Sequence, residues 1–199
     1  MSPIGKFTLK ALIWLPLCFG AWYFLSILFV LPVAAALDGL MSWAFPDLVR
    51  AIKPDGNAVS ITTQLTALQA DLGAAVKGDL VFTVNPLIYG YCVPFYTALV
   101  LAAPGHDSKT LGYWIIGMLI LFLVQLFGLA AEITKVLAFN INDEARERLG
   151  FSALGYEGLA LVYQFGYLIL PAVSPVLIWI SQFRHQLPQL IHPVTTTRF

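Results

Sequence analysis

Four long stretches without a charged side chain constrain the fold of this 199-residue chain more than any other feature. They cover residues 11–37, 80–106, 110–131 and 158–183. The hydrocarbon core of a bilayer is about 30 Å thick, so a helix needs about 20 apolar residues to cross it, and a charge at its centre costs about 2.5–3.5 kcal/mol. Each stretch is long enough to cross. The sequence therefore predicts an all-α polytopic membrane protein with four transmembrane helices.

The composition excludes two other classes of protein. Hydrophobic residues make up 59% of the chain and charged residues 11%, against about 45–50% and 25% in a soluble domain. Lysine and arginine together number 11, as do aspartate and glutamate, so the chain lacks the excess of cations that binding to nucleic-acid phosphates requires. We therefore expect neither a soluble domain nor a nucleic-acid partner.

We expect one membrane domain over residues 1–199, with spans at about 11–37, 86–103, 112–131 and 158–183. The second span is placed at Pro86 because proline suits the first turn of a helix and Asn85 can cap it. The first stretch also has features of a secretory signal, but the apolar part of a signal is typically 7–15 residues long, so a membrane anchor is favoured.

Lysine and arginine are denser in segments 1–10, 104–111 and 184–199 than in segments 38–85 and 132–157. Positively charged loops favour the cytoplasmic side of a membrane. The sequence therefore predicts that both termini are cytoplasmic and that the two longer segments lie outside.

The first outer segment, 38–85, has the alternating pattern of strands. Residues 59–65 and 80–84 alternate apolar and polar or smaller side chains, with a period of two. We expect a small β-hairpin-like flap here, and residues 66–78 between the strands are consistent with a helical turn or with a plain loop. An isolated hairpin is marginally stable, so the flap should pack on the membrane surface or on a partner.

The second outer segment, 132–157, is predicted to form an amphipathic helix at the membrane surface. Its apolar residues recur near one helical face, and Gly150 ends a run of charged residues. Glu132 and Lys135 are expected to pair on one face of the helix without any special role, because residues three positions apart are neighbours there.

No catalytic or metal-binding pattern is evident in the sequence. Cys18 and Cys92 are predicted at different depths, so we expect no disulfide between them. His106, His185 and His192 lack carboxylate or thiol neighbours at ligand spacing. We therefore expect no enzymatic activity, no catalytic residues, no metal and no cofactor.

Polar and aromatic side chains within the spans are the candidates for contact with a partner. Two prolines and a glycine in segment 85–96 should distort the second span, and its tyrosines fit either an aromatic belt, the simpler interpretation, or a docking groove. Gln125 and Gln164 are expected to join helices rather than to line a transport path. No GxxxG motif supports homo-oligomers. The candidate partner-contact residues are Asn85, Tyr89, Tyr91, Tyr96, Gln125, Tyr163, Gln164 and Tyr167.

Three segments of the chain resemble the exosortase H-associated membrane proteins, which are small multi-span bacterial proteins encoded beside exosortase H. The segments are Leu12–Tyr23, Asn85–Leu99 and Tyr163–Trp179. The resemblance implies an accessory role in a protein-sorting system of the bacterial inner membrane, where an exosortase cleaves C-terminal membrane anchors. It implies three partners: membrane lipid, the exosortase, or an anchored substrate. The family has no established activity to carry over. The Cys, Arg and His set expected of an exosortase itself is missing here, because no predicted span holds an arginine.

Two alternatives follow from the residues alone. The chain also fits an accessory structural subunit of a larger membrane complex of the respiratory or membrane-oxygenase type, because such subunits are apolar helices with few polar groups. Transport or lipid handling would need a polar or lipid-sized cavity between the spans, and the sequence offers neither a mid-span charge nor an inverted repeat for it. The proteins that copurify with the chain distinguish the accessory role in sorting from the role as a subunit of a larger complex.

Overall fold

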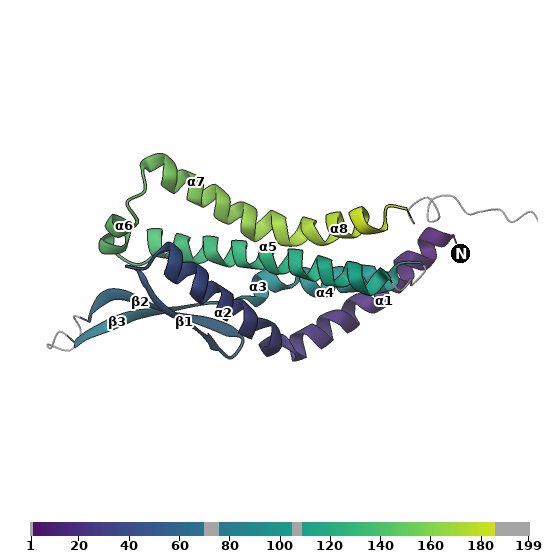
Figure 1. Ribbon diagram of the computed structural model, residues 1–199, viewed down its shortest axis with the longest axis horizontal. Coiled ribbons are helices and arrows are strands. Elements are labelled where there is room, and N and C mark those ends of the chain that lie inside the picture. Colours follow the sequence, from purple (N-terminus) through teal and green to yellow (C-terminus); the bar gives the residue numbers. More distant parts are fainter. Residues whose placement is uncertain (1, 70–75, 105–108, 186–199) are drawn as a thin grey trace, which may run out of the picture. The chain divides into compact units, whose positions relative to one another are not determined.

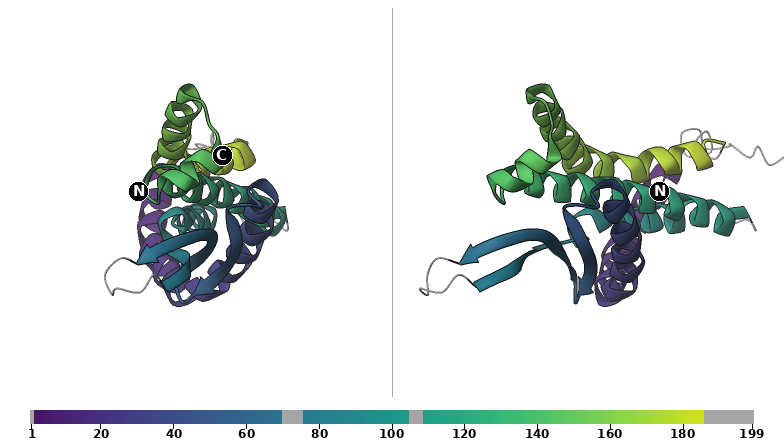
Figure 2. Two further views of the ribbon diagram at one scale, coloured as in Figure 1. Left: turned by 90° about the vertical axis from the view of Figure 1, so that its left-hand side faces the viewer. Right: turned by 60° about the vertical axis from the view of Figure 1, so that its left-hand side comes forward.

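A computed structural model describes residues 2–69, 76–104 and 109–185 of the chain, which form helices and one small sheet (Figures 1 and 2). The elements in chain order are α1 (Pro3–Phe24), α2 (Ser26–Ala44), β1 (Val49–Asp55), β2 (Ala58–Gln69), β3 (Val76–Val84), α3 (Leu87–Gly90), α4 (Cys92–Ala102), α5 (Lys109–Phe139), α6 (Asp143–Leu149), α7 (Ala153–Gln164), the π-helix η2 (Phe165–Ile169) and α8 (Leu170–Phe183).

Four helices in the described ranges are long and apolar enough to cross a membrane. They are α1, α2, α5 and the continuous helix Ala153–Phe183, which comprises α7, η2 and α8. A shorter apolar helix covers Leu87–Ala102. The chain is therefore a mostly helical, multi-pass membrane protein, as predicted. Helix α5 and the helix Ala153–Phe183 contain the predicted third and fourth spans, whereas the predicted first span is divided between α1 and α2 and the second corresponds to the shorter helix Leu87–Ala102.

The predicted first span, 11–37, is two helices that meet at Leu25, whose φ of −97° and ψ of 10° are not helical. Neither glycine nor proline marks this position, so the sequence carries no signal for the break. A tertiary contact follows it directly, because the Ser26 hydroxyl donates a hydrogen bond of 2.8 Å to Oδ1 of Asn57. The predicted second span is interrupted as expected, since Pro94 cannot donate to the carbonyl of Gly90.

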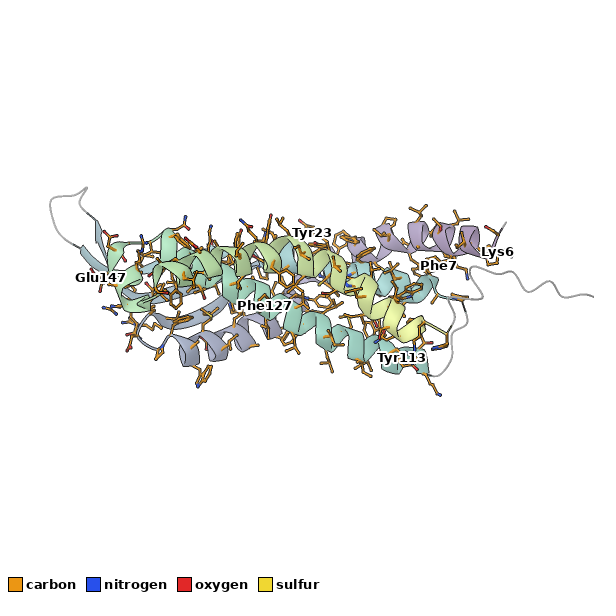
Figure 3. The ribbon with its side chains drawn as sticks, turned by 90° about the horizontal axis from the view of Figure 1, so that it is seen from above. Lys6, Phe7, Tyr23, Tyr113, Phe127 and Glu147 are labelled. Atoms are coloured by element: carbon orange, nitrogen blue, oxygen red, sulfur yellow. The ribbon has the colours of Figure 1, made fainter. Side chains whose placement is uncertain are left out.

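The chain divides into two compact units. The described residues of the first unit are 2–25, 91–104, 109–123 and 171–185. Here α1 packs against α4. Aromatic pairs add to the packing: Phe7 stacks on Trp179, with ring centroids 5.1 Å apart, and Tyr113 meets Phe183 edge-on at 5.9 Å. Figure 3 shows the positions of Phe7 and Tyr113.

The second unit comprises Ser26–Gly90 and Val124–Leu170 and contains the antiparallel sheet, in the order β1-β2-β3. Helix α2 packs on β1, and Oδ1 of Asp38 accepts a hydrogen bond of 2.6 Å from the backbone N–H of Ile52. The strands β1 and β2 are joined through Gly56, whose φ of +59° is a conformation that favours glycine. The buried side chains of α2 recur at helical spacing, at Val30, Val33, Ala34, Leu37 and Met41.

The predicted hairpin-like flap is a three-stranded sheet. Its expected buried face is confirmed on β2, where Val59, Ile61, Thr63 and Leu65 are each 0% exposed. The sequence does not predict β1. Its residues Arg50, Lys53 and Pro54 interrupt the alternation of apolar and polar side chains that marks a strand, and the strand is held by a hydrogen bond to α2. Residues 66–69 and 76–78, between the predicted strands, extend β2 and β3, while 70–75 lie outside the described residues.

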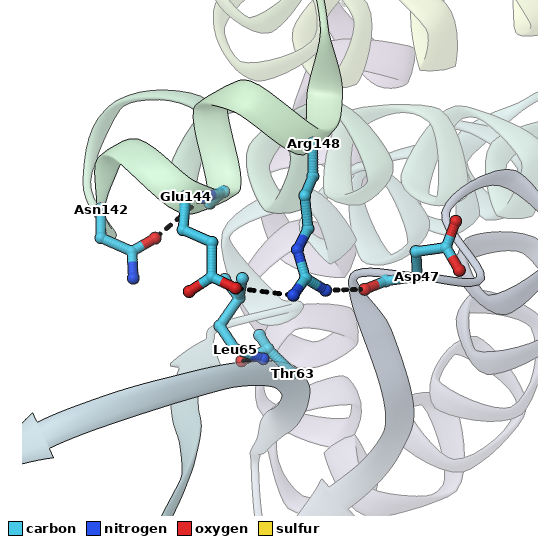
Figure 4. Close-up of polar contacts among 7 residues, drawn as sticks. Asp47, Thr63, Leu65, Asn142, Glu144 and Arg148 are labelled. Carbon is cyan, nitrogen blue, oxygen red and sulfur yellow. Dashed lines mark hydrogen bonds and ion pairs between the residues drawn. The ribbon is translucent and has the colours of Figure 1, made fainter.

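The segment 132–157, predicted as one amphipathic helix, is divided in the structure between the end of α5, the short helix α6 and the start of α7. Helix α5 continues to Phe139, and the short helix α6 follows with Asn142 as its N-cap and Gly150, at φ +60°, as its C-cap. In Figure 4 the Arg148 guanidinium donates to the carbonyl oxygen of Asp47 (2.8 Å) and to Glu144 (2.6 Å). The apolar face of 132–139 is buried against protein, as at Ile133 and Leu137, so the segment completes α5 rather than starting a separate helix.

Candidate interaction site

Two glycines allow α5 and the π-helix η2 to approach each other closely within the second unit. A Cβ atom added at Gly166 would lie 3.2 Å from the Cα atom of Gly128. A Cβ atom added at Gly128 would lie 2.4 Å from Cδ1 of Tyr89. Short π-helices within α-helices occur frequently at functional sites, and this one brings the backbone of Gly166 against α5. Glycine is therefore required at both positions for this packing.

Three tyrosines from two segments meet at this crossing, and we call them the tyrosine cluster: Tyr89, Tyr163 and Tyr167. The Tyr89 side chain is 0% exposed, and its ring meets that of Tyr167 edge-on with centroids 5.9 Å apart. Tyr167 in turn stacks on Tyr163 at 5.7 Å. Such ring pairs contribute about 0.5–1.5 kcal/mol beyond the burial of their surface. The cluster therefore ties α3 to the long C-terminal helix.

Two charged side chains of α5 reach the tyrosine cluster. The carboxyl group of Glu132 lies beside the Tyr89 hydroxyl, which is its hydrogen-bond partner. The Lys135 ammonium lies 5.1 Å from the centroid of the Tyr163 ring, a cation–π contact. Glu132 and Lys135 attract each other electrostatically, but the direct ion pairs among the described residues are Arg50–Asp79 and Arg148–Glu144.

A second polar cluster lies in the first unit around Tyr96, which is 0% exposed. Its hydroxyl donates to Oε1 of Gln182 at 2.6 Å and lies 2.9 Å from the carbonyl oxygen of Tyr113. The Gln182 amide nitrogen donates to the same carbonyl at 2.9 Å. These bonds join α4, α5 and α8 through groups that would otherwise be unpaired in an apolar environment.

The other predicted contact residues take different places. Asn85 caps α3, with its Oδ1 accepting the N–H of Leu87 at 3.0 Å. Tyr91 is half-buried, and Gln125 is buried at 5% exposed. Gln164 is exposed on α7. The structure thus brings Tyr89, Tyr163 and Tyr167 together, and the contact of all eight residues with a partner stays a prediction.

Several residues that complete these clusters are not among the predicted contact residues. The sequence predicts no special role for Glu132 and Lys135, and it gives no reason to single out Gln182. The sequence does indicate that Glu132 and Lys135 lie on the same side of a helix as Gly128, because the three residues follow the i, i+4, i+7 spacing of one helical face. What they contact depends on the fold, however, because Tyr89 and Tyr163 lie far away in the sequence.

Metal ligation has little support in the part of the chain that the structure describes. No three histidine, cysteine, aspartate or glutamate side chains converge there. The thiols of Cys18 and Cys92 are not joined in a disulfide, as expected. His185 is exposed, and His106 and His192 lie outside the described residues. The clusters described above can hold helices together and offer polar groups to a ligand.

Comparison with known proteins identifies a family. The sequence model for a family described as exosortase H-associated membrane protein matches residues 1–186, nearly the whole chain. No curated protein and no solved structure matches the chain. The match covers every described helix and strand.

Proposed function

The chain belongs to the exosortase H-associated membrane protein family, and on that premise we propose that it is a non-catalytic accessory protein that binds the exosortase or the membrane anchors of its substrates. The family description links the chain to the sorting system. Further support comes from surfaces suited to contact with another membrane protein.

One observation carries the binding role: an exposed amide on an apolar helix surface. Gln164 is exposed on α7, and Leu161 (67% exposed) and Leu168 (60% exposed) lie beside it on the same helical face, at positions i−3 and i+4. A polar side chain that faces lipid seeks a hydrogen-bond partner, and side-chain hydrogen bonds between membrane helices contribute about 0.6 kcal/mol on average. A helix of a second membrane protein would supply that partner.

The test is copurification of co-expressed exosortase H with the tagged full chain in mild detergent. We expect Gln164→Leu to reduce the recovered exosortase about threefold, the loss that corresponds to one average interhelical hydrogen bond. Ser181→Leu is the matched control, because it also replaces an exposed polar residue of the same long helix and should leave recovery unchanged.

Recovery that is equal for both variants would contradict the role of this surface. The same purification distinguishes the second class of function: subunits of a metabolic membrane complex at stoichiometric levels, in place of the exosortase or its substrates, would contradict the sorting role itself.

A further inference from the structure

The sheet of the second unit has two outer strands, β1 and β3, and α2 covers the outer edge of β1. The N–H of Ile52 points away from β2, because it donates to Oδ1 of Asp38 on α2. Backbone groups of alternate residues point to the same side of a strand, so Pro54 also faces outward, where its missing N–H costs no bond to β2. A covering helix and a proline are devices that keep an outer strand from pairing with a second chain.

The same alternation shows which backbone groups of β3 point away from the sheet. Because Ile52 faces Ile61 without a backbone hydrogen bond, Ile61 turns its N–H and C=O groups towards β3, where it is paired with Phe82. Val81 and Thr83, on either side of Phe82, therefore direct their N–H and C=O groups outward. No hydrogen bond to these outward groups is present in the part of the chain that the structure describes.

We call the outward backbone groups of Val81 and Thr83 the β3 edge. Residues 80–84 contain neither a charge nor a proline, and no described element besides β2 packs extensively along β3. The side chains beside the edge are exposed as well, Val81 at 54%. Strands with such an open edge bind other extended chains through their main-chain groups, so the β3 edge is suited to accept one more strand.

The course of the chain after β3 indicates which partner fits the edge. Asn85 follows the strand and caps α3, and the apolar helix Leu87–Ala102 begins there. A chain that pairs with β3 in the parallel direction is carried towards the membrane at its own C-terminal end. A second copy of this chain fits less well, because two strands related by a two-fold axis pair antiparallel, whereas β3 runs towards the membrane in both copies.

We propose that the β3 edge binds the extended segment that precedes the C-terminal membrane anchor of a sorting substrate, as an additional strand parallel to β3. The inference rests on the proposed function, and it names the substrate as the partner that this surface contacts. It also requires the sheet to lie on the outer side of the membrane, as the sequence predicts. Hydrogen bonds to main-chain groups hold the segment whatever its side chains are, so one edge accepts substrates of different sequence.

The test is photo-cross-linking in membranes that contain the tagged full chain and a reporter protein ending in the pre-anchor segment and anchor of an exosortase H substrate. The photoreactive residue p-benzoyl-phenylalanine replaces either Val81, beside the open edge, or Lys53, an exposed control position on the covered strand β1. We expect cross-links to the pre-anchor segment from position 81 and none from position 53. Cross-links from position 81 to a second copy of the chain instead would overturn the proposal.

Two variants of one residue distinguish main-chain pairing from side-chain contact. Thr83→Pro removes an outward N–H without removing a bond to β2, and we expect it to lower the cross-linked fraction about fivefold, the effect of one net backbone hydrogen bond. Thr83→Val keeps the N–H and should leave the fraction unchanged. Equal fractions for the two variants would refute pairing through the main chain. If Thr83→Pro does not fold, the cross-links of the chain with Thr83 intact decide alone.

Copurification of the reporter with the unmodified chain separates this inference from the proposed function. A reporter that copurifies but does not cross-link from position 81 contradicts the inference and leaves the proposed function standing. If neither the reporter nor co-expressed exosortase H copurifies, both are contradicted.

Discussion

At the scale of single residues, Gly117 shows how little space the first unit leaves around its buried tyrosine. A Cβ atom at this position would lie 2.2 Å from both the Cζ atom and the hydroxyl oxygen of Tyr96. The ring is fully buried and held by Gln182, so it cannot move aside without losing its hydrogen bond.

We expect Gly117→Ala to lower the free energy of unfolding by about 1–3 kcal/mol, the usual cost of overpacking. Gly112→Ala is the control on the same helix, because an added Cβ meets nothing within 4 Å there, and it should be neutral or stabilising by up to about 1 kcal/mol. Thermal unfolding in one detergent measures both variants. Equal stability of the two would show that Tyr96 is not confined in this way.

Residue types alone indicated part of the candidate site. Tyr89, Tyr163 and Tyr167 are predicted to contact a partner, which stays a prediction, and the structure places them in one cluster with Glu132. The sequence could not indicate the role of Glu132, because a carboxylate at the end of a span looks solvated until Tyr89 and Gly128 are known to lie beside it. Gln182 was missed for the same reason, since its partner Tyr96 lies on another helix.

At the scale of elements, one aspartate joins the sheet to the membrane helices of the second unit. Asp38 of α2 accepts the N–H of Ile52 on β1, and this strand carries none of the alternation that would hold it by packing alone. We expect Asp38→Ala to speed hydrogen exchange of the Ile52 amide by about tenfold, since an unsatisfied buried group costs about 1–3 kcal/mol. Asp38→Asn keeps an acceptor oxygen and should retain most of the protection. If Asp38→Ala leaves exchange unchanged, this bond does not hold β1.

The elements that were predicted correctly are those whose signal is local. The period of two on β2 follows from one buried face, and the disrupted helix around Gly90 and Pro94 follows from proline chemistry. The break at Leu25 and the strand β1 are each accompanied by a contact with a residue elsewhere in the chain: Ser26 bonds to Asn57, and Ile52 bonds to Asp38. Local sequence carries no trace of either.

At the scale of the whole molecule, the predicted orientation can be tested by labelling. With Cys18 and Cys92 replaced by serine, a single cysteine is introduced either in the sheet, as Lys53→Cys, or after α8, as His185→Cys; both sites are exposed. We expect a membrane-impermeant maleimide to label the first variant in intact spheroplasts and the second only after the membrane is permeabilised. The reverse pattern would place the termini outside.

We propose that this membrane protein serves a sorting system by binding its enzyme or its substrates. The most direct measurement is mass spectrometry of the proteins that copurify with the tagged chain from native membranes in mild detergent. We expect an exosortase or its anchored substrates in amounts comparable to the chain. Recovery of stoichiometric subunits of a respiratory or oxygenase complex, with neither of those present, would contradict it.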